Sequence, residues 1–191
     1  MQQKSATRVA HAPPGVKRVL ITAEELASRV GELGRQIGAD YVDRHPVLVG
    51  VLTGAVVFLA DLMRAIEVPL QCELMGVSSY GGASQSSGIV KITADLPVSI
   101  EDRHVLIVED IIDTGRTINY LKRNLETRHP RTLRICTLLD KIERREVPVN
   151  LDYVGFTIPN EFVVGYGLDH AGLHRNLPFL AALDLARRDD G

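Results

Sequence analysis

The chain of 191 residues contains no tryptophan, only two cysteines and no clear excess of either charge. Its formal net charge of -2 provides no overall positive field for nucleic acid, although a local basic patch is compatible with it. Cys72 and Cys136 form no C-x-x-C pair and have no metal-ligand spacing, so the sequence predicts neither a disulfide framework nor a zinc site. Both lie in apolar stretches, and we expect them to be reduced core residues of a cytoplasmic protein.

The sequence also lacks a hydrophobic run long enough to cross a membrane. The longest uncharged run, residues 46–60, is shorter than the ~20 residues that a span requires, and Thr53-Gly54 interrupts it. Residues 1–15 are polar and aperiodic, so we expect a disordered arm without the hydrophobic core of a signal peptide. With 45% hydrophobic residues and no repeats, residues 16–191 are expected to form one domain.

The most informative stretch is Val105–Thr117, which has the pattern of a buried strand, a loop and the start of a helix. Residues 105–108 are aliphatic, as is typical of a parallel strand buried on both faces. The carboxylates Glu109 and Asp110 follow where the apolar run stops, and Asp113 follows after two isoleucines. Since ligands bind beyond the carboxyl ends of the strands in open α/β sheets, we expect a ligand site here.

The residues after Asp113 predict a phosphate site. Thr114 and Thr117 provide hydroxyls and Gly115 permits a tight turn. The helix that follows from Arg116 begins with unpaired N–H groups, which bind anions. The chain contains neither a Walker loop nor a G-x-G-x-x-G motif after a strand, so this cradle is of another type. The two adjacent carboxylates upstream suit ribose hydroxyls or a hydrated Mg²⁺, so the ligand is expected to be a ribose phosphate.

The stretch from Val105 to Thr117 resembles the phosphoribosyl diphosphate motif of type I phosphoribosyltransferases, and its Glu-Asp-Ile-Ile-Asp form is similar to that of the hypoxanthine-guanine phosphoribosyltransferases. The residues that the resemblance assigns to the phosphoribosyl group are Glu109, Asp110, Asp113, Thr114, Gly115, Arg116 and Thr117. It extends over residues 16–183 and implies an α/β fold with a central, mostly parallel sheet flanked by helices. A small hood subdomain, from the N-terminal segment and residues of about 150–183, and a flexible lid hairpin would complete this fold.

The same resemblance implies an activity in purine salvage. A 5-phosphoribosyl group would be transferred from phosphoribosyl diphosphate to N9 of hypoxanthine or guanine, giving IMP or GMP and diphosphate. Mg²⁺ is the implied cofactor, and a homodimer or homotetramer is the implied assembly.

A β-loop-α unit precedes the phosphoribosyl motif. A capping-box pattern at Thr22 predicts an amphipathic helix, residues 47–52 predict a second buried strand, and Thr53-Gly54 is a turn before a helix over 55–66. From the residues alone this is an ordinary turn, whereas the resemblance makes it the diphosphate-binding loop. Many relatives carry lysine where this chain has Thr53, so a cation is missing while the backbone N–H groups remain.

Between predicted strands over 70–77 and 91–94 lies a segment rich in glycine and serine, residues 78–88, which we expect to be mobile. Its composition alone is also compatible with a solvated hairpin linker. The resemblance implies a lid that excludes water from the reacting centre and carries a Ser-Tyr pair, Ser79 and Tyr80.

The resemblance assigns three residues to the purine base. Lys141 follows a predicted strand over 133–139 and would bind the exocyclic oxygen at position 6, although a lysine after a strand is commonly a surface charge. Phe162 would stack on the base, although a single phenylalanine also suits a core position. Val163 would offer backbone groups to the Watson–Crick edge.

Further residues are assigned to the metal and the diphosphate. The segment Phe162–Asp169 resembles the purine-binding segment of the family, and Asp169 would border the purine and hold Mg²⁺. Glu109 and Asp110 are the other expected metal ligands. Arg175 would pair with diphosphate through its forked donors.

Asp113 is the candidate general base, because it could take the N7 proton of the purine while N9 attacks the ribose. Two alternatives stay open: phosphoribosyl transfer to xanthine, uracil or orotate, and a regulator that binds nucleotide and controls RNA or DNA. Lys141 with Phe162 favours a 6-oxopurine, and the absence of a helix-turn-helix pattern argues against a regulator. The charge run Glu143–Glu146 predicts a solvated surface rather than a binding patch.

Overall fold

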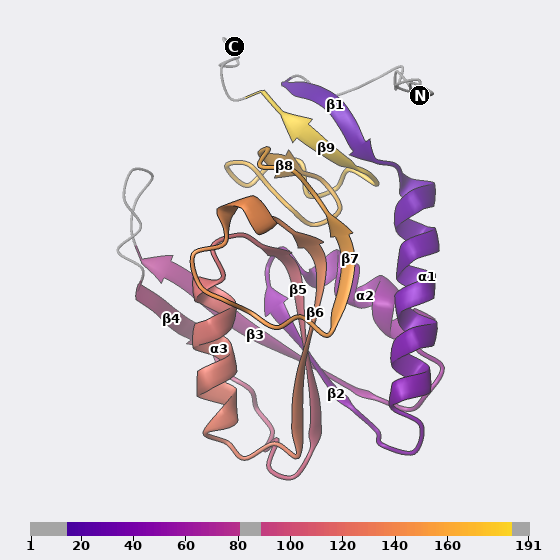
Figure 1. Cartoon of the computed structure of the whole chain (residues 1–191), viewed down its shortest axis with the longest axis vertical. Helices are drawn as coiled ribbons and strands as arrows, with labels where there is room; N and C mark the ends of the chain where they lie inside the picture. Colours follow the sequence, from indigo (N-terminus) through magenta and orange to yellow (C-terminus); the bar gives the residue numbers. More distant parts are fainter. Residues whose placement is uncertain (1–14, 81–88, 185–191) are drawn as a thin grey trace.

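The structure, a computed structural model, describes residues 15–80 and 89–184 (Figure 1). Its centre is a six-stranded sheet in the order β4-β3-β2-β5-β6-β7. All neighbouring strands are parallel except β3 and β4, which form an antiparallel pair. The predicted α/β class with a mostly parallel sheet is therefore confirmed. The strands are β2 (Val47–Leu52), β3 (Gln71–Tyr80), β4 (Ile89–Ala94), β5 (His104–Ile112), β6 (Thr132–Asp140) and β7 (Tyr153–Thr157).

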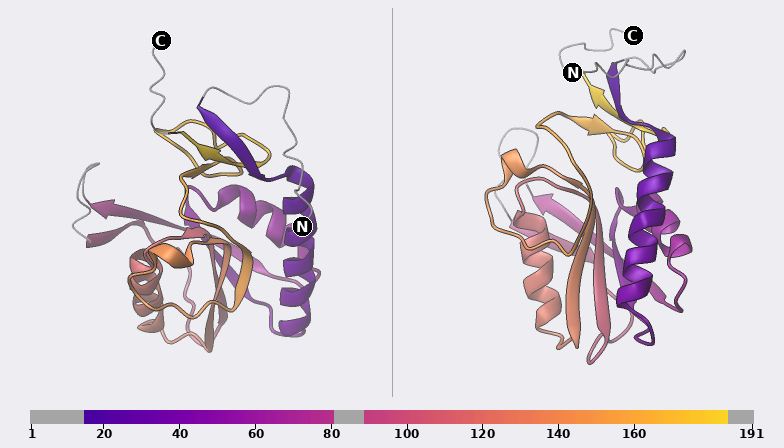
Figure 2. Two further views of the ribbon diagram at one scale, coloured as in Figure 1. Left: turned by 45° about the horizontal axis from the view of Figure 1, so that its top comes forward. Right: turned by 45° about the vertical axis from the view of Figure 1, so that its right-hand side comes forward.

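Helices cover both faces of this sheet (Figure 2). On one face lie α1 (Ala23–Asp40) and α2 (Val56–Ala65), and on the other lies α3 (Arg116–Glu126). The predicted capping box is present at the start of α1, because the Glu25 N–H donates to Thr22 Oγ1 at 3.2 Å and the Thr22 N–H donates to the Glu25 carboxylate at 2.9 Å. No helix in the described ranges is both long and apolar enough to cross a membrane.

The sheet separates two hydrophobic cores, and strand alternation decides which residues enter each. Leu106 and Val108 of β5 pack with α1 and α2, whereas Val105 and Ile107 pack with α3. Successive side chains of a strand normally point to opposite faces. This alternation is interrupted after Val108, because Ile111 packs with the core of α1 and α2 and Ile112 with the core of α3.

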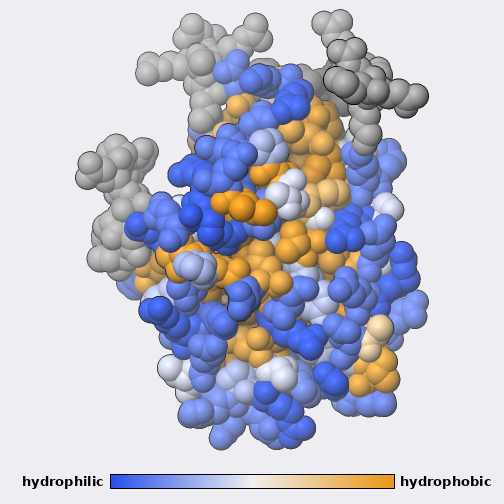
Figure 3. Space-filling view, viewed as in Figure 1, coloured by the Kyte–Doolittle hydropathy of each residue, from blue (hydrophilic) through white to orange (hydrophobic). Residues whose placement is uncertain are grey.

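A second sheet of three antiparallel strands lies beyond the end of the central sheet, next to the start of α1 (Figure 1). Its order is β1-β9-β8, from β1 (Val16–Ile21), β8 (Val163–Val164) and β9 (Leu180–Leu183). We call residues 16–21 and 158–183 the hood. On the face seen in Figure 3, apolar residues gather over the hood and along the band where it meets the central sheet.

Two sequence predictions need correction. β5 continues to Ile112, because its pairing with β6 extends to the Ile112–Asp140 pair, so the carboxylates lie within the strand rather than after it. Cys72 is exposed, because α2 packs on β2 and not over the start of β3, whereas Cys136 is buried as predicted.

Candidate active site

The carboxyl ends of β2, β5 and β6 lie side by side, because these strands are adjacent and parallel. The loops that follow them therefore meet at one edge, as the sequence predicted for a ligand site. They contribute Thr53-Gly54, the turn from Asp113 to Thr117, and Lys141. The hood adds the chain from Phe162 to Arg175.

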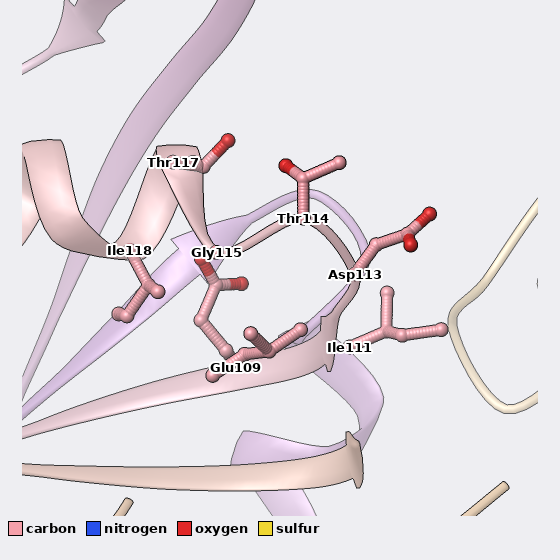
Figure 4. Close-up of a pocket in the computed structure, with 8 residues that line it drawn as sticks. Glu109, Ile111, Asp113, Thr114, Gly115, Thr117 and Ile118 are labelled. Atoms are coloured by element: carbon pink, nitrogen blue, oxygen red, sulfur yellow. The ribbon is translucent and has the colours of Figure 1, made fainter. Parts of the chain in front are cut away.

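The turn after β5 has the geometry of an anion cradle. Gly115 precedes α3 at a φ of 84°, and a Cβ there would lie 2.7 Å from the Val147 carbonyl oxygen, so the turn requires glycine. Gly115 gives the helix no side-chain cap, and the Arg116 N–H makes only a long contact to Thr114 Oγ1 at 3.4 Å, so the first turn can turn its amides to an anion. Figure 4 shows the hydroxyls of Thr114 and Thr117 on one side of this turn and the Glu109 carboxyl beneath Gly115 on the other. The turn borders a cavity of about 90 Å³ lined by Glu109, Ile111, Ile112, Asp113, Thr114, Gly115, Thr117 and Ile118.

Glu109 and Asp110 are adjacent in sequence and their carboxyl groups interact with each other, but they border different parts of the site. Glu109 is 6% exposed and faces the α3 side, where burial, and secondly the negative charge of Asp110, raise its pKa well above the ordinary value. Asp110 lies against Gly54. Burial raises the pKa of Asp110 as well, opposed by the Ile111 N–H at 2.8 Å and by the charge of Arg175.

The turn after β2 packs directly on Asp110. The peptide bond between Leu52 and Thr53 is cis, and a Cβ at Gly54 would overlap the Asp110 carboxylate, lying 2.7 Å from its Cγ. A side chain at this position is therefore incompatible with the observed contact. The structure brings the expected diphosphate turn and one expected metal ligand into contact.

Lys141 is buried rather than on the surface, with 6% of the residue exposed. Burial lowers the pKa of its ammonium, whereas the negative charge of Asp113 raises it. Within residues 15–80 and 89–184, no hydrogen bond or ion pair reaches Nζ. Its ammonium is not among the enclosed side-chain atoms that lack a hydrogen bond, so the buried stem carries Nζ to the open edge of the site, where a polar ligand atom could meet it. Asp113 itself is partly exposed, and its carboxylate lies 3.2 Å from Arg144 Nε.

The hood presents an aromatic ring and an ion pair to the same edge. Phe162 is 39% exposed and meets the His170 ring edge to face at 5.2 Å, so it is not a core residue. Asp169 pairs with Arg175 Nη2 at 2.7 Å, and Arg175 Nη1 donates to the Gly167 carbonyl at 2.6 Å. Val163 is buried in β8, opposite Ala182.

Sequence reasoning missed the role of the charge run Glu143–Glu146, which it predicted to be only a solvated surface. Three of its residues make ion pairs with the site loops, namely Arg144 with Asp113, Arg145 with Asp140, and Glu146 with Arg116. The Glu146 and Val147 amides also donate to the Thr114 carbonyl at 3.0 and 3.1 Å. Glu143, Arg144 and Glu146 are exposed, as predicted for a solvated surface. The ion pairs of Arg144 and Glu146 were not predicted because their partners are distant in sequence, whereas Asp140 lies only five residues before Arg145.

The expected lid lies largely outside the described residues. Ser79 and Tyr80 end β3, but their side chains and residues 81–88 lie outside the described part of the chain. Among the described residues, no group of three or more His, Cys, Asp or Glu side chains is arranged to hold a metal. Any metal here would need ligand oxygens from the substrate as well.

Comparisons with known proteins agree with this geometry. The sequence profile of the phosphoribosyl transferase domain matches residues 20–171. A hypoxanthine-guanine phosphoribosyltransferase from Mycobacterium avium is 52% identical over 178 residues, covering 90% of this chain and 88% of the relative. The crystal structure of a hypoxanthine phosphoribosyltransferase from Staphylococcus aureus is 45% identical, with a TM-score of 0.85 and coverage of 89% and 92%. A Trypanosoma cruzi hypoxanthine phosphoribosyl transferase, studied for the role of its C-terminal region in oligomeric state and activity, is 43% identical, with a TM-score of 0.85 and coverage of 91% and 94%.

Proposed function

The chain belongs to the phosphoribosyl transferase family, and from this membership we infer that it is an enzyme of purine salvage acting on hypoxanthine and guanine. It transfers the 5-phosphoribosyl group of phosphoribosyl diphosphate to N9 of the base. The bond from C1 of the ribose to diphosphate breaks, the bond from N9 to C1 forms, and the N7 proton leaves the base. The products are IMP or GMP and diphosphate.

The phosphoribosyl group is bound by the turn after β5. The 5′-phosphate lies against the uncapped amides at the start of α3, with the hydroxyls of Thr114 and Thr117 as further donors. Asp113 accepts the N7 proton, since its partly exposed carboxylate lies at the open end of this turn. Holding the ribose and the base at neighbouring loops supplies much of the rate acceleration by proximity.

The observation that supports the choice of base is Lys141, whose stem is buried and whose ammonium has no hydrogen bond or ion pair within the described residues, at the same strand edge as Asp113. An exocyclic oxygen at position 6 accepts a hydrogen bond from this ammonium, whereas the amino group of adenine cannot. Phe162 offers an exposed ring face for stacking on the base.

Magnesium fits a subset of the expected ligands. Asp110 contacts the diphosphate turn at Gly54, and Asp169 lies at the same edge, paired with Arg175. We propose Asp110 and Asp169 as the protein carboxylates that would hold Mg²⁺, with the remaining positions filled by substrate oxygens and water. Glu109 points beneath the Gly115 turn and would have to leave it to reach the metal or the ribose. When bound, the metal stabilises the negative charge that develops on the departing diphosphate.

We propose that the chain forms a cytoplasmic homodimer or homotetramer. The Trypanosoma cruzi relative was studied for the role of its C-terminal region on oligomeric state and enzymatic activity. Size-exclusion chromatography with light scattering of the purified chain would establish the number of subunits.

The test is a spectrophotometric assay of the purified chain with phosphoribosyl diphosphate, Mg²⁺ and one nucleobase at a time. We expect turnover of hypoxanthine and guanine and none of adenine, uracil or orotate. Exclusive turnover of uracil or orotate, or no turnover of any base alongside binding of RNA or DNA, would overturn the assignment.

A further inference from the structure

A charged residue outside the expected site contacts the proposed base. After β6 the chain forms a short 3-10 helix, η1 (Ile142–Arg144), in which the Arg144 N–H donates to the Lys141 carbonyl at 3.2 Å. This turn returns Arg144 to the β5 loop, where its Nε lies 3.2 Å from Asp113 Oδ1. Arg144 and Lys141 are thus held at the same carboxylate by one local turn.

The Asp113 oxygen involved is buried although the residue is partly exposed. In the described part of the chain, no hydrogen bond reaches Oδ1, so the Arg144 ion pair is its compensating contact. A surface ion pair of half-exposed side chains usually contributes little, but a buried carboxylate oxygen requires a positive or donating neighbour. Asp113 Oδ1 is such a buried carboxylate oxygen.

Lys141 is the other cation beside Asp113. Its amide N–H donates to the Ile112 carbonyl at 3.0 Å, which fixes it beside the β5 loop. Its ammonium interacts with both charges, that of Asp113 and that of Arg144. A lysine side chain is flexible, so without Arg144 it could turn to Asp113 and neutralise it.

We propose that Arg144 is a positioning residue, which holds Asp113 by Oδ1 and so leaves the Lys141 ammonium available to the oxygen at position 6 of the purine. This inference rests on the proposed function, because it needs Asp113 as the base and Lys141 as the purine ligand. It assigns a role in base recognition to the charge run after β6. The groups proposed to bind the two ends of phosphoribosyl diphosphate, the amides at the start of α3 and the turn after β2, are not the partners of Arg144, whose ion pair is with Asp113.

The experiment compares steady-state kinetics of the wild-type chain, Arg144→Gln and Arg144→Lys with hypoxanthine and phosphoribosyl diphosphate as the varied substrates. For Arg144→Gln we expect the KM for hypoxanthine to rise about tenfold with a lower kcat, the scale of leaving a buried acceptor oxygen without its compensating contact. The KM for phosphoribosyl diphosphate should stay within about twofold. Arg144→Lys should restore most of the loss, because it returns a cation.

A matched control is Arg131→Gln, which removes an exposed arginine–aspartate pair with Asp102 at the opposite edge of the sheet. Its kinetics should equal those of the wild type. Equal increases in both KM values for Arg144→Gln, no change at all, or no rescue by lysine would each overturn the proposal. Absence of wild-type turnover of hypoxanthine would instead overturn the proposed function, so the two failures are distinguishable.

A double-mutant cycle tests the mechanism itself. In an Asp113→Asn background Arg144 has no carboxylate to hold, so adding Arg144→Gln should change the hypoxanthine KM by less than about twofold. A further rise of about tenfold in that background would show that Arg144 acts without Asp113 and would refute the positioning role.

Discussion

Replacing Gly54 by alanine tests the contact between the proposed diphosphate turn and the β5 carboxylates. The added Cβ would overlap the Asp110 carboxylate and lie 2.7 Å from its Cγ. Carbon atoms in contact prefer about 3.5–4.0 Å, so the carboxyl group would have to retreat by about 1 Å. Its Oδ1 accepts from the Ile111 N–H at 2.8 Å, and the carbonyl of Gly54 itself is close-packed on Gly167, so neither side yields freely.

Two magnitudes follow from that displacement. Overpacking of this kind costs about 1–3 kcal/mol, and at about 2–4 °C for each kcal/mol in a chain of this size the melting temperature should fall by roughly 2–12 °C. A displacement of about 1 Å at a positioning contact lowers catalysis on the order of 10²-fold, and here it should appear mainly in kcat/KM for phosphoribosyl diphosphate.

The assay combines thermal unfolding with initial rates at varied phosphoribosyl diphosphate. The control is Gly31→Ala in α1, where a Cβ would meet only Arg35 Nη1 at 3.6 Å. That substitution should leave the kinetics unchanged and stabilise the fold by about 0.5–1 kcal/mol, because alanine favours helix. A Gly54→Ala variant with wild-type kcat/KM and melting temperature would refute the packing argument.

Three further substitutions probe the site. Asp113→Asn should lower kcat about 10²-fold or more while GMP still binds by calorimetry, and wild-type turnover would remove Asp113 as the base. Phe162→Leu should raise the KM for hypoxanthine roughly 2–10-fold, the scale of about 0.5–1.5 kcal/mol of stacking, and an unchanged KM would contradict a stacked base. The raised pKa of Glu109 keeps it protonated in the folded chain while the unfolded chain ionises above its ordinary 4.5, so this group lowers stability as pH rises. Glu109→Gln should therefore have a higher melting temperature than the wild type at pH 7–8. An increase in melting temperature that persists below pH 4.5 would show that the raised pKa of Glu109 is not its cause.

Local sequence patterns were sufficient for most of the fold. The capping box at Thr22 and the aliphatic runs of β2 and β5 each depend on residues close in sequence, and both predictions hold in the structure. The sequence predicted that β5 ends at Val108, before its observed end at Ile112, because charged residues commonly follow the end of a buried strand. Glu109 and Asp110 stay in it because β6 continues to pair with that segment, a contact that hydropathy does not encode.

The site was harder to predict where it depends on tertiary contacts. Alternation could not place Glu109 and Asp110, because it is interrupted between Val108 and Ile111, which pack on the same core. The partners of Arg144 and Arg145 could not be inferred, since an arginine in a charge run has many carboxylates available in sequence. The exposure of Cys72 likewise depends on which strands α2 covers.

The residues that sequence rules explain least are also those that a substrate would compensate. Within the described residues, the ammonium on the buried stem of Lys141 has no hydrogen bond or ion pair, and α3 begins without a side-chain cap from Gly115. Both features leave polar groups less well satisfied in the free protein than they could be. Each is complementary to one group of a purine ribose phosphate, the oxygen at position 6 and the 5′-phosphate. Structural needs alone would favour a neutral residue and a side-chain cap at these two positions. Their joint presence at one sheet edge therefore argues for selection by a ligand that carries both groups, which free nucleobases and sugar phosphates separately do not.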